Sequence, residues 1–184
     1  DGDYILNILA TSWLEEGKLN KKAVVGTVMS NLGFIKSMES LGINFEKTAV
    51  GDRYVLEKML ENDYTLGGEQ SGHVIMRQFS NTGDGLLTAL QVMQVVAKSK
   101  KSLLELATTM EKYPQILINV DGVNKDQLNS SAKIKDAVLE AEKQLSGIGR
   151  VLLRASGTES LVRVMVEAND LQLTQKIADS LAQL

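Results

Sequence analysis

The chain has 184 residues, of which 43% are hydrophobic, and its formal net charge of −3 arises from charges spread along the sequence. This composition predicts one large or two small folded domains, and without a basic block it argues against nucleic-acid and membrane partners. The lack of cysteine excludes disulfides and thiolate metal sites. No apolar run approaches the roughly 20 residues that a membrane helix needs, so we expect a soluble, cytoplasmic protein.

The first hundred residues alternate predicted helices and strands. In chain order we expect a helix capped by Asp3 and running to about Glu16, a strand at 23–28, a helix at 34–41, a strand at 47–50, a helix capped by Asp52, strands at 64–66 and 74–76, and a helix capped by Asp84. Such alternation predicts an α/β domain, with a parallel or mixed sheet and helices on both faces, over residues 1–100.

A smaller domain is predicted to follow. Residues 101–114 are expected to form a linker and a helix at 103–110, which opens with a capping box of Ser102 and Glu105. Next we expect a strand at 115–120, a helix opened by Ser130 or Ser131 and closed by Gly147, strands at 149–153 and 161–166, and a last helix capped by Asp170. These elements predict an α+β domain over residues 115–184.

The segment Arg154-Ala155-Ser156-Gly157-Thr158-Glu159-Ser160 connects the last two predicted strands. Its guanidinium, hydroxyls and glycine can offer many hydrogen-bond donors to one phosphate dianion. Arg163 lies on the following strand, on the face opposite to the valines at 162, 164 and 166, where a second cation could reach the same anion. The segment therefore predicts a phosphate site, and the alternative is a tight polar turn in which Arg154 pairs with Glu159.

A second polar loop, Gly67-Gly68-Glu69-Gln70-Ser71-Gly72-His73, lies between two predicted strands. Its carboxylate, hydroxyl and amide groups suit the hydroxyls of a sugar ring. His73 is the only histidine, and an imidazole can exchange a proton with a sugar hydroxyl near neutral pH. The alternatives are a flexible turn and a purely structural histidine, and a metal site is disfavoured because no second histidine or cysteine can share it.

Three further segments carry weaker signals. Gly51 and Asp52 follow a predicted strand at a helix start, where an N-cap role explains Asp52 without a ligand. The segment 27–31 also follows a strand, at the end where α/β sheets bind ligands, although it could be a simple turn. Asp1-Gly2-Asp3 is like half of an acidic metal loop, but a helix cap is the simpler explanation.

The loops at 67–73 and 154–160, together with segments 27–33, 50–55 and 83–85, resemble the α-D-phosphohexomutase superfamily, and specifically the bacterial phosphoglucosamine mutases. The resemblance covers essentially the whole chain and implies the third and fourth of four domains around a cleft. It implies interconversion of glucosamine 6-phosphate and glucosamine 1-phosphate through a bisphosphorylated intermediate. The phosphoserine and the magnesium ion of such enzymes belong to the first and second domains, so we expect no metal in this chain.

The same resemblance assigns roles to individual residues. Glu69 and Ser71 would bind sugar hydroxyls, His73 would lie near the reacting phosphoryl group, and Gly51 and Asp52 would help to read the orientation of the sugar. The non-reacting phosphate would be held by Arg154, Ser156, Gly157, Thr158 and Arg163.

The resemblance also implies partners for the chain: a phosphosugar substrate, the N-terminal domains of the same protein, and a homodimer of the full-length enzyme. The chain by itself should bind phosphosugar weakly at best and should not catalyse turnover. The alternatives are a phosphoglucomutase or phosphomannomutase fragment, a non-catalytic phosphosugar-binding module, and a pure interaction domain.

Overall fold

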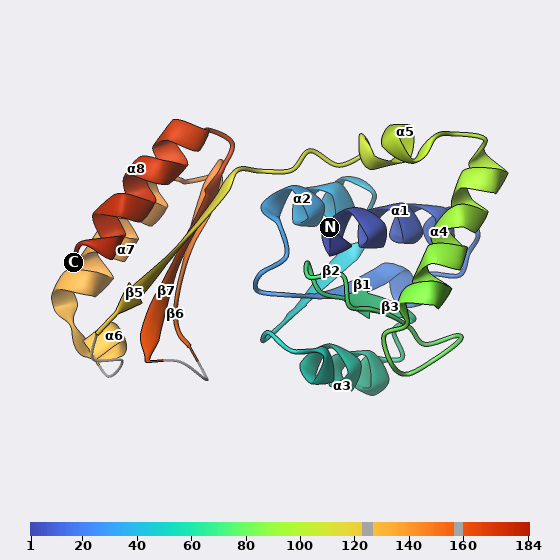
Figure 1. The fold of residues 1–184 in the computed structure, drawn as a ribbon, viewed down its shortest axis with the longest axis horizontal. Coiled ribbons are helices and arrows are strands. Elements are labelled where there is room, and N and C mark those ends of the chain that lie inside the picture. The colour runs from blue at the N-terminus through green and yellow to red at the C-terminus, as the bar shows by residue number, and fades with distance from the viewer. Residues whose placement is uncertain (123–126, 157–159) are drawn as a thin grey trace. The chain divides into compact units, whose positions relative to one another are not determined.

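The structure is a computed structural model that describes residues 1–122, 127–156 and 160–184. It divides the chain into two compact units, Asp1–Lys112 and Tyr113–Leu184 (Figure 1). Residues 101–112 of the segment expected as linker and helix fall within the first unit. There Thr109 Oγ1 accepts a hydrogen bond of 2.8 Å from Asn7 Nδ2, which ties the segment to the first helix.

The first unit contains a four-stranded mixed sheet, as the sequence predicted. Its strands are β1 (Ala23–Thr27), β2 (Asn44–Thr48), β3 (Leu66–Gly68) and β4 (Val74–Met76), in the order β2-β1-β3-β4. The first three strands run parallel, and β4 is antiparallel to β3. Every residue of β1 is buried, as expected for a strand that is covered by helices on both faces.

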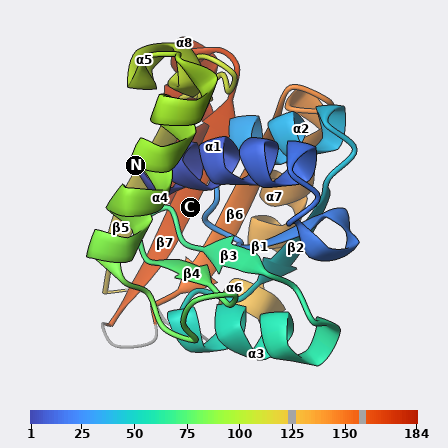
Figure 2. The same ribbon diagram turned by 90° about the vertical axis from the view of Figure 1, so that its right-hand side faces the viewer.

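Helices cover both faces of this sheet (Figures 1 and 2). They are α1 (Gly2–Glu15), α2 (Leu32–Ser40), α3 (Asp52–Asn62), α4 (Gly85–Ser99) and α5 (Leu103–Ala107), with a short 3-10 turn at Asn20–Lys22. On one face, α1, α2, α4 and α5 share a core that includes Leu6 and Phe34. On the other face, Val55 and Met59 of α3 pack against Val25 of β1.

The topology of the sheet brings three loops to one edge. From β1 the chain passes through α2 to β2 on one side, and then through α3 to β3 on the other side of β1. Because the three strands are parallel, the segments that follow them, at 28–31, 49–51 and 69–73, lie at the same carboxyl edge. In open α/β sheets this edge, where the direction of winding reverses, is the usual place for a ligand.

Two predicted helix caps were wrong. Asp1, rather than Asp3, caps α1, and Asp3 is fully buried, where its Oδ2 accepts a hydrogen bond of 2.7 Å from the backbone N–H of Asn31. Gly51, rather than Asp52, is the N-cap of α3, because the helix already begins at Asp52. In both cases a residue one or two positions earlier takes the cap. The predicted caps Asp84, Ser102, Ser131 and Asp170 are confirmed.

Several predicted boundaries also moved. The strand expected at 64–66 begins at Leu66, because the Tyr64 backbone N–H donates to the Met59 carbonyl at 2.9 Å and so belongs to the end of α3. The strand expected at 47–50 is Asn44–Thr48, and the helix expected at 103–110 ends at Ala107.

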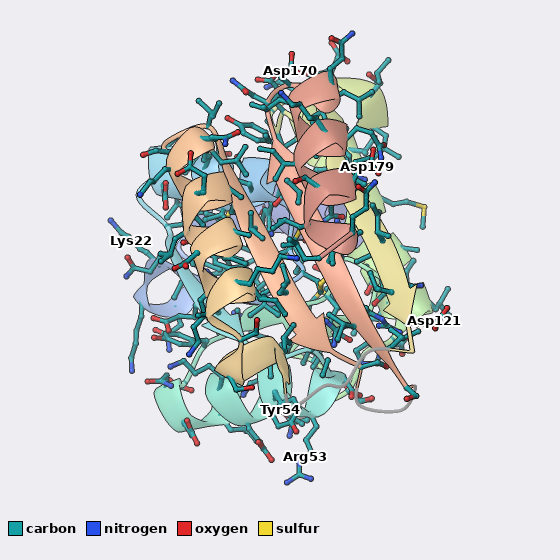
Figure 3. The ribbon with its side chains drawn as sticks, turned by 90° about the vertical axis from the view of Figure 1, so that its left-hand side faces the viewer. Lys22, Arg53, Tyr54, Asp121, Asp170 and Asp179 are labelled. Carbon is teal, nitrogen blue, oxygen red and sulfur yellow. The ribbon has the colours of Figure 1, made fainter. Side chains whose placement is uncertain are left out.

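The second unit is an antiparallel sheet with helices packed on one face, which confirms the α+β prediction. Its strands are β5 (Gln115–Asp121), β6 (Gly149–Ala155) and β7 (Leu161–Ala168), in the order β5-β7-β6, and its helices are α6 (Gln127–Ser130), α7 (Ala132–Gln144) and α8 (Leu171–Ala182). Val164 and Val166 of β7 pack against Ile177 and Leu181 of α8. Figure 3 shows α7 and α8 side by side in front of the strands, with Asp170 at the start of α8.

No helix in the part of the chain that the structure describes is long and apolar enough to cross a membrane.

Candidate functional site

In the first unit, the loop at 69–73 contacts the start of α3 at two points. The backbone N–H of Gly51 donates to Glu69 Oε1 at 3.0 Å, and Asp52 Oδ2 lies 3.5 Å from His73 Nε2. Gly51 has a φ of +131°, which L-residues rarely adopt, so glycine is needed where the turn directs its N–H at the loop. The structure thus brings together four predicted site residues, which we call the edge cluster: Gly51, Asp52, Glu69 and His73.

The imidazole of His73 also packs on Gly83. A Cβ atom built on Gly83 would lie 2.6 Å from His73 Nε2 and 2.7 Å from Cε1, so the ring packs directly on the glycine. The side chain of His73 is 36% exposed, although its Nε2 atom is buried. Since Nε2 faces Gly83 and Asp52, the exposed part of the ring is elsewhere, and a ligand would meet that part.

The remaining predicted residues of the first unit differ in exposure. Ser71 lies at the exposed tip of the loop, where its hydroxyl can reach a ligand. By contrast Ser30 and Asn31 are fully buried, and Asn31 Oδ1 accepts a hydrogen bond of 3.0 Å from the Gly33 N–H at the start of α2. These two side chains of segment 27–31 therefore stabilise the fold. This agrees with the alternative that the segment is a simple turn. Arg53 extends away from α3 (Figure 3) and pairs with Glu57 at 2.8 Å on the surface.

In the second unit, Arg154 and Arg163 lie directly opposite each other on β6 and β7. Their neighbours Leu153 and Val164 belong to the core under the helices, so both arginines project from the other face of the sheet. Directly opposed residues have Cβ atoms only about 5 Å apart, and like charges at that spacing repel. Burial, and then the charge of Arg163, lower the pKa of Arg154.

Arg154 makes no ion pair with another of the described residues, and its buried Nε has no hydrogen-bond partner among them. An anion placed between Arg154 and Arg163 would remove the repulsion and supply the missing acceptor. The charge and the missing acceptor of the pair are therefore suited to an anion.

The turn between β6 and β7 is described in part. Ser156 is only 4% exposed, and its backbone N–H donates to the Leu161 carbonyl at 2.9 Å, which closes the end of the hairpin. Gly157 and Thr158, which were predicted to bind phosphate, lie outside the described residues. The same is true of Glu159, and so of the alternative in which it pairs with Arg154.

Sequence reasoning missed Gly83 as part of the site. It lies ten residues after His73, beyond the next strand, and spacing alone carries no signal that the two would touch. Within the ranges that the structure describes, no group of three or more histidine, aspartate or glutamate side chains could hold a metal ion.

Two family models match the chain in succession. "Phosphoglucomutase/phosphomannomutase, alpha/beta/alpha domain III" matches residues 1–113, and "Phosphoglucomutase/phosphomannomutase, C-terminal domain" matches residues 117–184. The phosphoglucosamine mutase of Streptomyces coelicolor is 54% identical over 182 residues, which are 99% of this chain and 40% of that protein. The phosphoglucosamine mutase of Caldicellulosiruptor saccharolyticus is 48% identical over 186 residues, covering 100% of this chain and 41% of that protein. The chain thus spans about 40% of the length of these relatives.

Solved structures with the same fold have lower sequence identity. N-acetylphosphoglucosamine mutase of Aspergillus fumigatus, in complex with GlcNAc-6P and magnesium, matches with a TM-score of 0.84 and 19% identity, over 100% of this chain and 46% of that one. An N-acetylglucosamine-phosphate mutase of the α-D-phosphohexomutase superfamily, in its substrate complex, matches with a TM-score of 0.82 and 22% identity, over 100% and 43%. Since two family models together match nearly all of it, the chain belongs to the phosphoglucomutase/phosphomannomutase family, of which it comprises domain III and the C-terminal domain.

Proposed function

We propose that the chain is the sugar- and phosphate-binding part of a mutase that interconverts glucosamine 6-phosphate and glucosamine 1-phosphate. The observation that carries the proposal is the pair of opposed arginines, Arg154 and Arg163, whose repulsion an anion would relieve. The choice of amino sugar follows from the relatives of about 50% identity, which are phosphoglucosamine mutases.

In this proposal the second unit anchors the phosphate that does not react. Arg154 and Arg163 would each donate to the phosphate oxygens, and the Ser156 hydroxyl would add a donor at the end of the hairpin. Gly157 and Thr158 would complete the site by their backbone and hydroxyl groups. A fixed anchor would allow the sugar to present either of its ends to the same reacting group, so this unit contributes positioning to catalysis.

The edge cluster of the first unit would read the sugar. Glu69 and Ser71 would hydrogen-bond sugar hydroxyls, while the Gly51 N–H keeps the Glu69 carboxylate in place. When a sugar hydroxyl attacks phosphorus, it loses its proton, and His73 would accept it. Asp52 faces Nε2, so it would hold the ring with a proton on Nε2 and leave Nδ1 as the acceptor.

The phosphoryl donor and the metal would lie outside this chain. The phosphoserine and a magnesium ion, which would neutralise charge on the transferred phosphoryl group, would belong to the parts that the relatives carry in addition. We place the whole enzyme in the cytoplasm, acting on precursors of the cell wall, and we consider a homodimer of the full-length protein.

Two other functions remain candidates. The family models are named after phosphoglucomutase and phosphomannomutase, which favours a different hexose as the alternative substrate. The second candidate is a phosphosugar-binding module without activity of its own, because the residues proposed for this chain bind and position the sugar without supplying the phosphoryl group.

The test compares the 184-residue chain with the full-length protein. We expect the full-length protein to convert glucosamine 6-phosphate faster than glucose 6-phosphate or mannose 6-phosphate, as followed by ³¹P NMR. The chain alone should show no turnover, but glucosamine 6-phosphate should raise its melting temperature, and the Arg154→Met variant should lose this shift. Turnover by the chain alone, or an equal shift in the Arg154→Met variant, would contradict the proposal.

A further inference from the structure

Helix α4 is apolar on two opposite faces, and Gln91, Gln94 and Lys98 lie along one flank between them. Its sequence, Gly-Leu-Leu-Thr-Ala-Leu-Gln-Val-Met-Gln-Val-Val-Ala-Lys-Ser, has Lys98 as its single charged residue. One face packs on the core of the first unit through Leu87, Val92 and Val95. The opposite face exposes the five residues that we call the α4 stripe: Leu86, Ala89, Leu90, Met93 and Ala97.

The α4 stripe is well exposed and continuous. Leu86 is 72% exposed, Leu90 51% and Met93 56%. Their spacing of four and then three residues places them on one line along the helix, and with Ala97 the line extends over eleven residues, or roughly 16 Å. Figure 2 shows α4 on the outside of the first unit, running past α1.

Because α4 is apolar on two opposite faces, we expect both faces to be covered. Surface helices carry charged and polar residues on their outer face, whereas the outer face of α4 carries the α4 stripe. Contiguous exposed apolar surface marks an interaction site. The only charge on α4 is already engaged, because Lys98 Nζ donates to Glu16 Oε1 of α1 at 3.0 Å.

We infer that the α4 stripe is the docking surface for the part of the full-length polypeptide that lies outside domain III and the C-terminal domain. This inference rests on the proposed function, in which the chain is part of a longer mutase. The match covers 40% of the Streptomyces coelicolor relative, so 60% of that protein lies outside it and needs a surface to pack on. A family with a domain numbered III has further domains of the same polypeptide to supply that surface.

The chemistry of the stripe favours an attached domain over a diffusing partner. Permanent interfaces resemble a divided core, whereas partners that meet and separate keep more polar surfaces. The stripe offers no charge that could steer a separate protein towards it. A domain on the same polypeptide needs no such steering, because its local concentration is high.

Met93 supplies a direct test. It is 56% exposed, whereas Met38, Met59, Met76, Met110 and Met165 are at most 3% exposed and serve as internal references. Because oxidation of methionine follows its exposure, we expect Met93 to be oxidised about tenfold more slowly in the full-length protein than in the 184-residue chain. Peroxide treatment followed by peptide mass spectrometry measures both rates.

The outcomes separate the possible occupants. Protection of Met93 in the full-length protein that does not vary with protein concentration supports the inference. Equal oxidation rates in the two proteins would overturn it, and so would protection that appears only at concentrations where the protein dimerises, because a second copy would then be the occupant. Leu90→Glu in the full-length protein should expose Met93 again, while Leu104→Glu on α5, at a position 75% exposed, should not.

Mutase activity of the same full-length sample is measured separately. An active enzyme with unprotected Met93 leaves the proposed function intact and removes the docking surface. If Met93 is protected but the sample shows no activity towards any hexose phosphate, the docking surface stands and the proposed function is refuted.

Discussion

Replacement of Gly83 by alanine should displace the His73 ring without unfolding the protein. The new Cβ would lie 2.6 Å from Nε2, 2.7 Å from Cε1 and 2.8 Å from Cδ2, whereas such atoms are comfortable at about 3.5 Å. The ring must therefore retreat by about 1 Å. It ends a side chain that is 36% exposed, so it can turn away at a cost of about 1 kcal/mol in rotamer strain.

The same displacement should lower the catalytic rate strongly. A shift of about 1 Å in a group that must meet the substrate costs on the order of 10²-fold in rate, or ~2.7 kcal/mol of transition-state stabilisation. In the full-length Gly83→Ala variant we therefore expect kcat/KM to fall by about 10²-fold. The melting temperature should stay within a few degrees of the wild-type value.

Two assays test separately whether the His73 ring is displaced and whether its displacement lowers activity. His73 is the only histidine of the chain, so its imidazole gives one resolved NMR signal that reports the position of the ring. The matched control is Gly85→Ala, because a Cβ on Gly85 meets no atom within 4 Å. An unchanged imidazole signal in Gly83→Ala would refute the steric reasoning, and a shifted signal with full activity would refute the role of His73.

Three further predictions concern charge. Burial lowers the pKa of Arg154, so its positive charge opposes folding. Arg154→Met should therefore raise the melting temperature of the ligand-free chain and abolish its stabilisation by inorganic phosphate. A lower melting temperature of the ligand-free variant would contradict this. Glu167 is fully buried and pairs with Arg150 at 2.7 Å. Glu167→Ala leaves the charge of Arg150 without this partner, so it should lower the free energy of unfolding, measured in urea, by about 3–5 kcal/mol. The double replacement Arg150→Met/Glu167→Leu should restore most of that free energy. Hydrogen bonds from the hydroxyl and backbone N–H of Ser102 lower the pKa of Glu105. The contribution of Glu105 to folding stability is therefore present above its usual pKa and is lost as the pH falls through the lowered value. The melting temperatures of wild type and Glu105→Gln should converge in acid, and a constant difference between them would disprove the linkage.

The elements whose signals are local could be predicted from the sequence. Caps such as Asp84, Ser102 and Asp170 bond to a backbone N–H three residues later, so the cap and its partner lie in one short stretch. Asp3 and Asp52 looked like caps for the same reason. Asp3 instead accepts a hydrogen bond from the N–H of Asn31, 28 residues away, and only the folded sheet brings that group to it.

In the candidate site, too, local features could be predicted from the sequence, whereas contacts between distant segments could not. The alternation of β7 places Arg163 opposite to the valines, which the sequence predicted, but its position directly across from Arg154 depends on the register of the hairpin. The contact between Gly51 and Glu69 depends on the strand order β2-β1-β3, which hydrophobic periodicity does not contain. The roles of these residues in binding stay predictions until a ligand is tested.

The face of the second sheet opposite to its helices keeps its opposite charges apart. Glu167 and Arg163 are four residues apart on β7, or about 13 Å along the strand, and Met165 lies between them. The Glu167 carboxylate is held by Arg150, so it cannot swing over to neutralise the arginines at the far end. The hairpin of β6 and β7 thus carries a structural ion pair at one end and the proposed anion site at the other. Evolution or protein engineering could therefore adapt the proposed anion site to another anion without disturbing the ion pair at the other end of the hairpin.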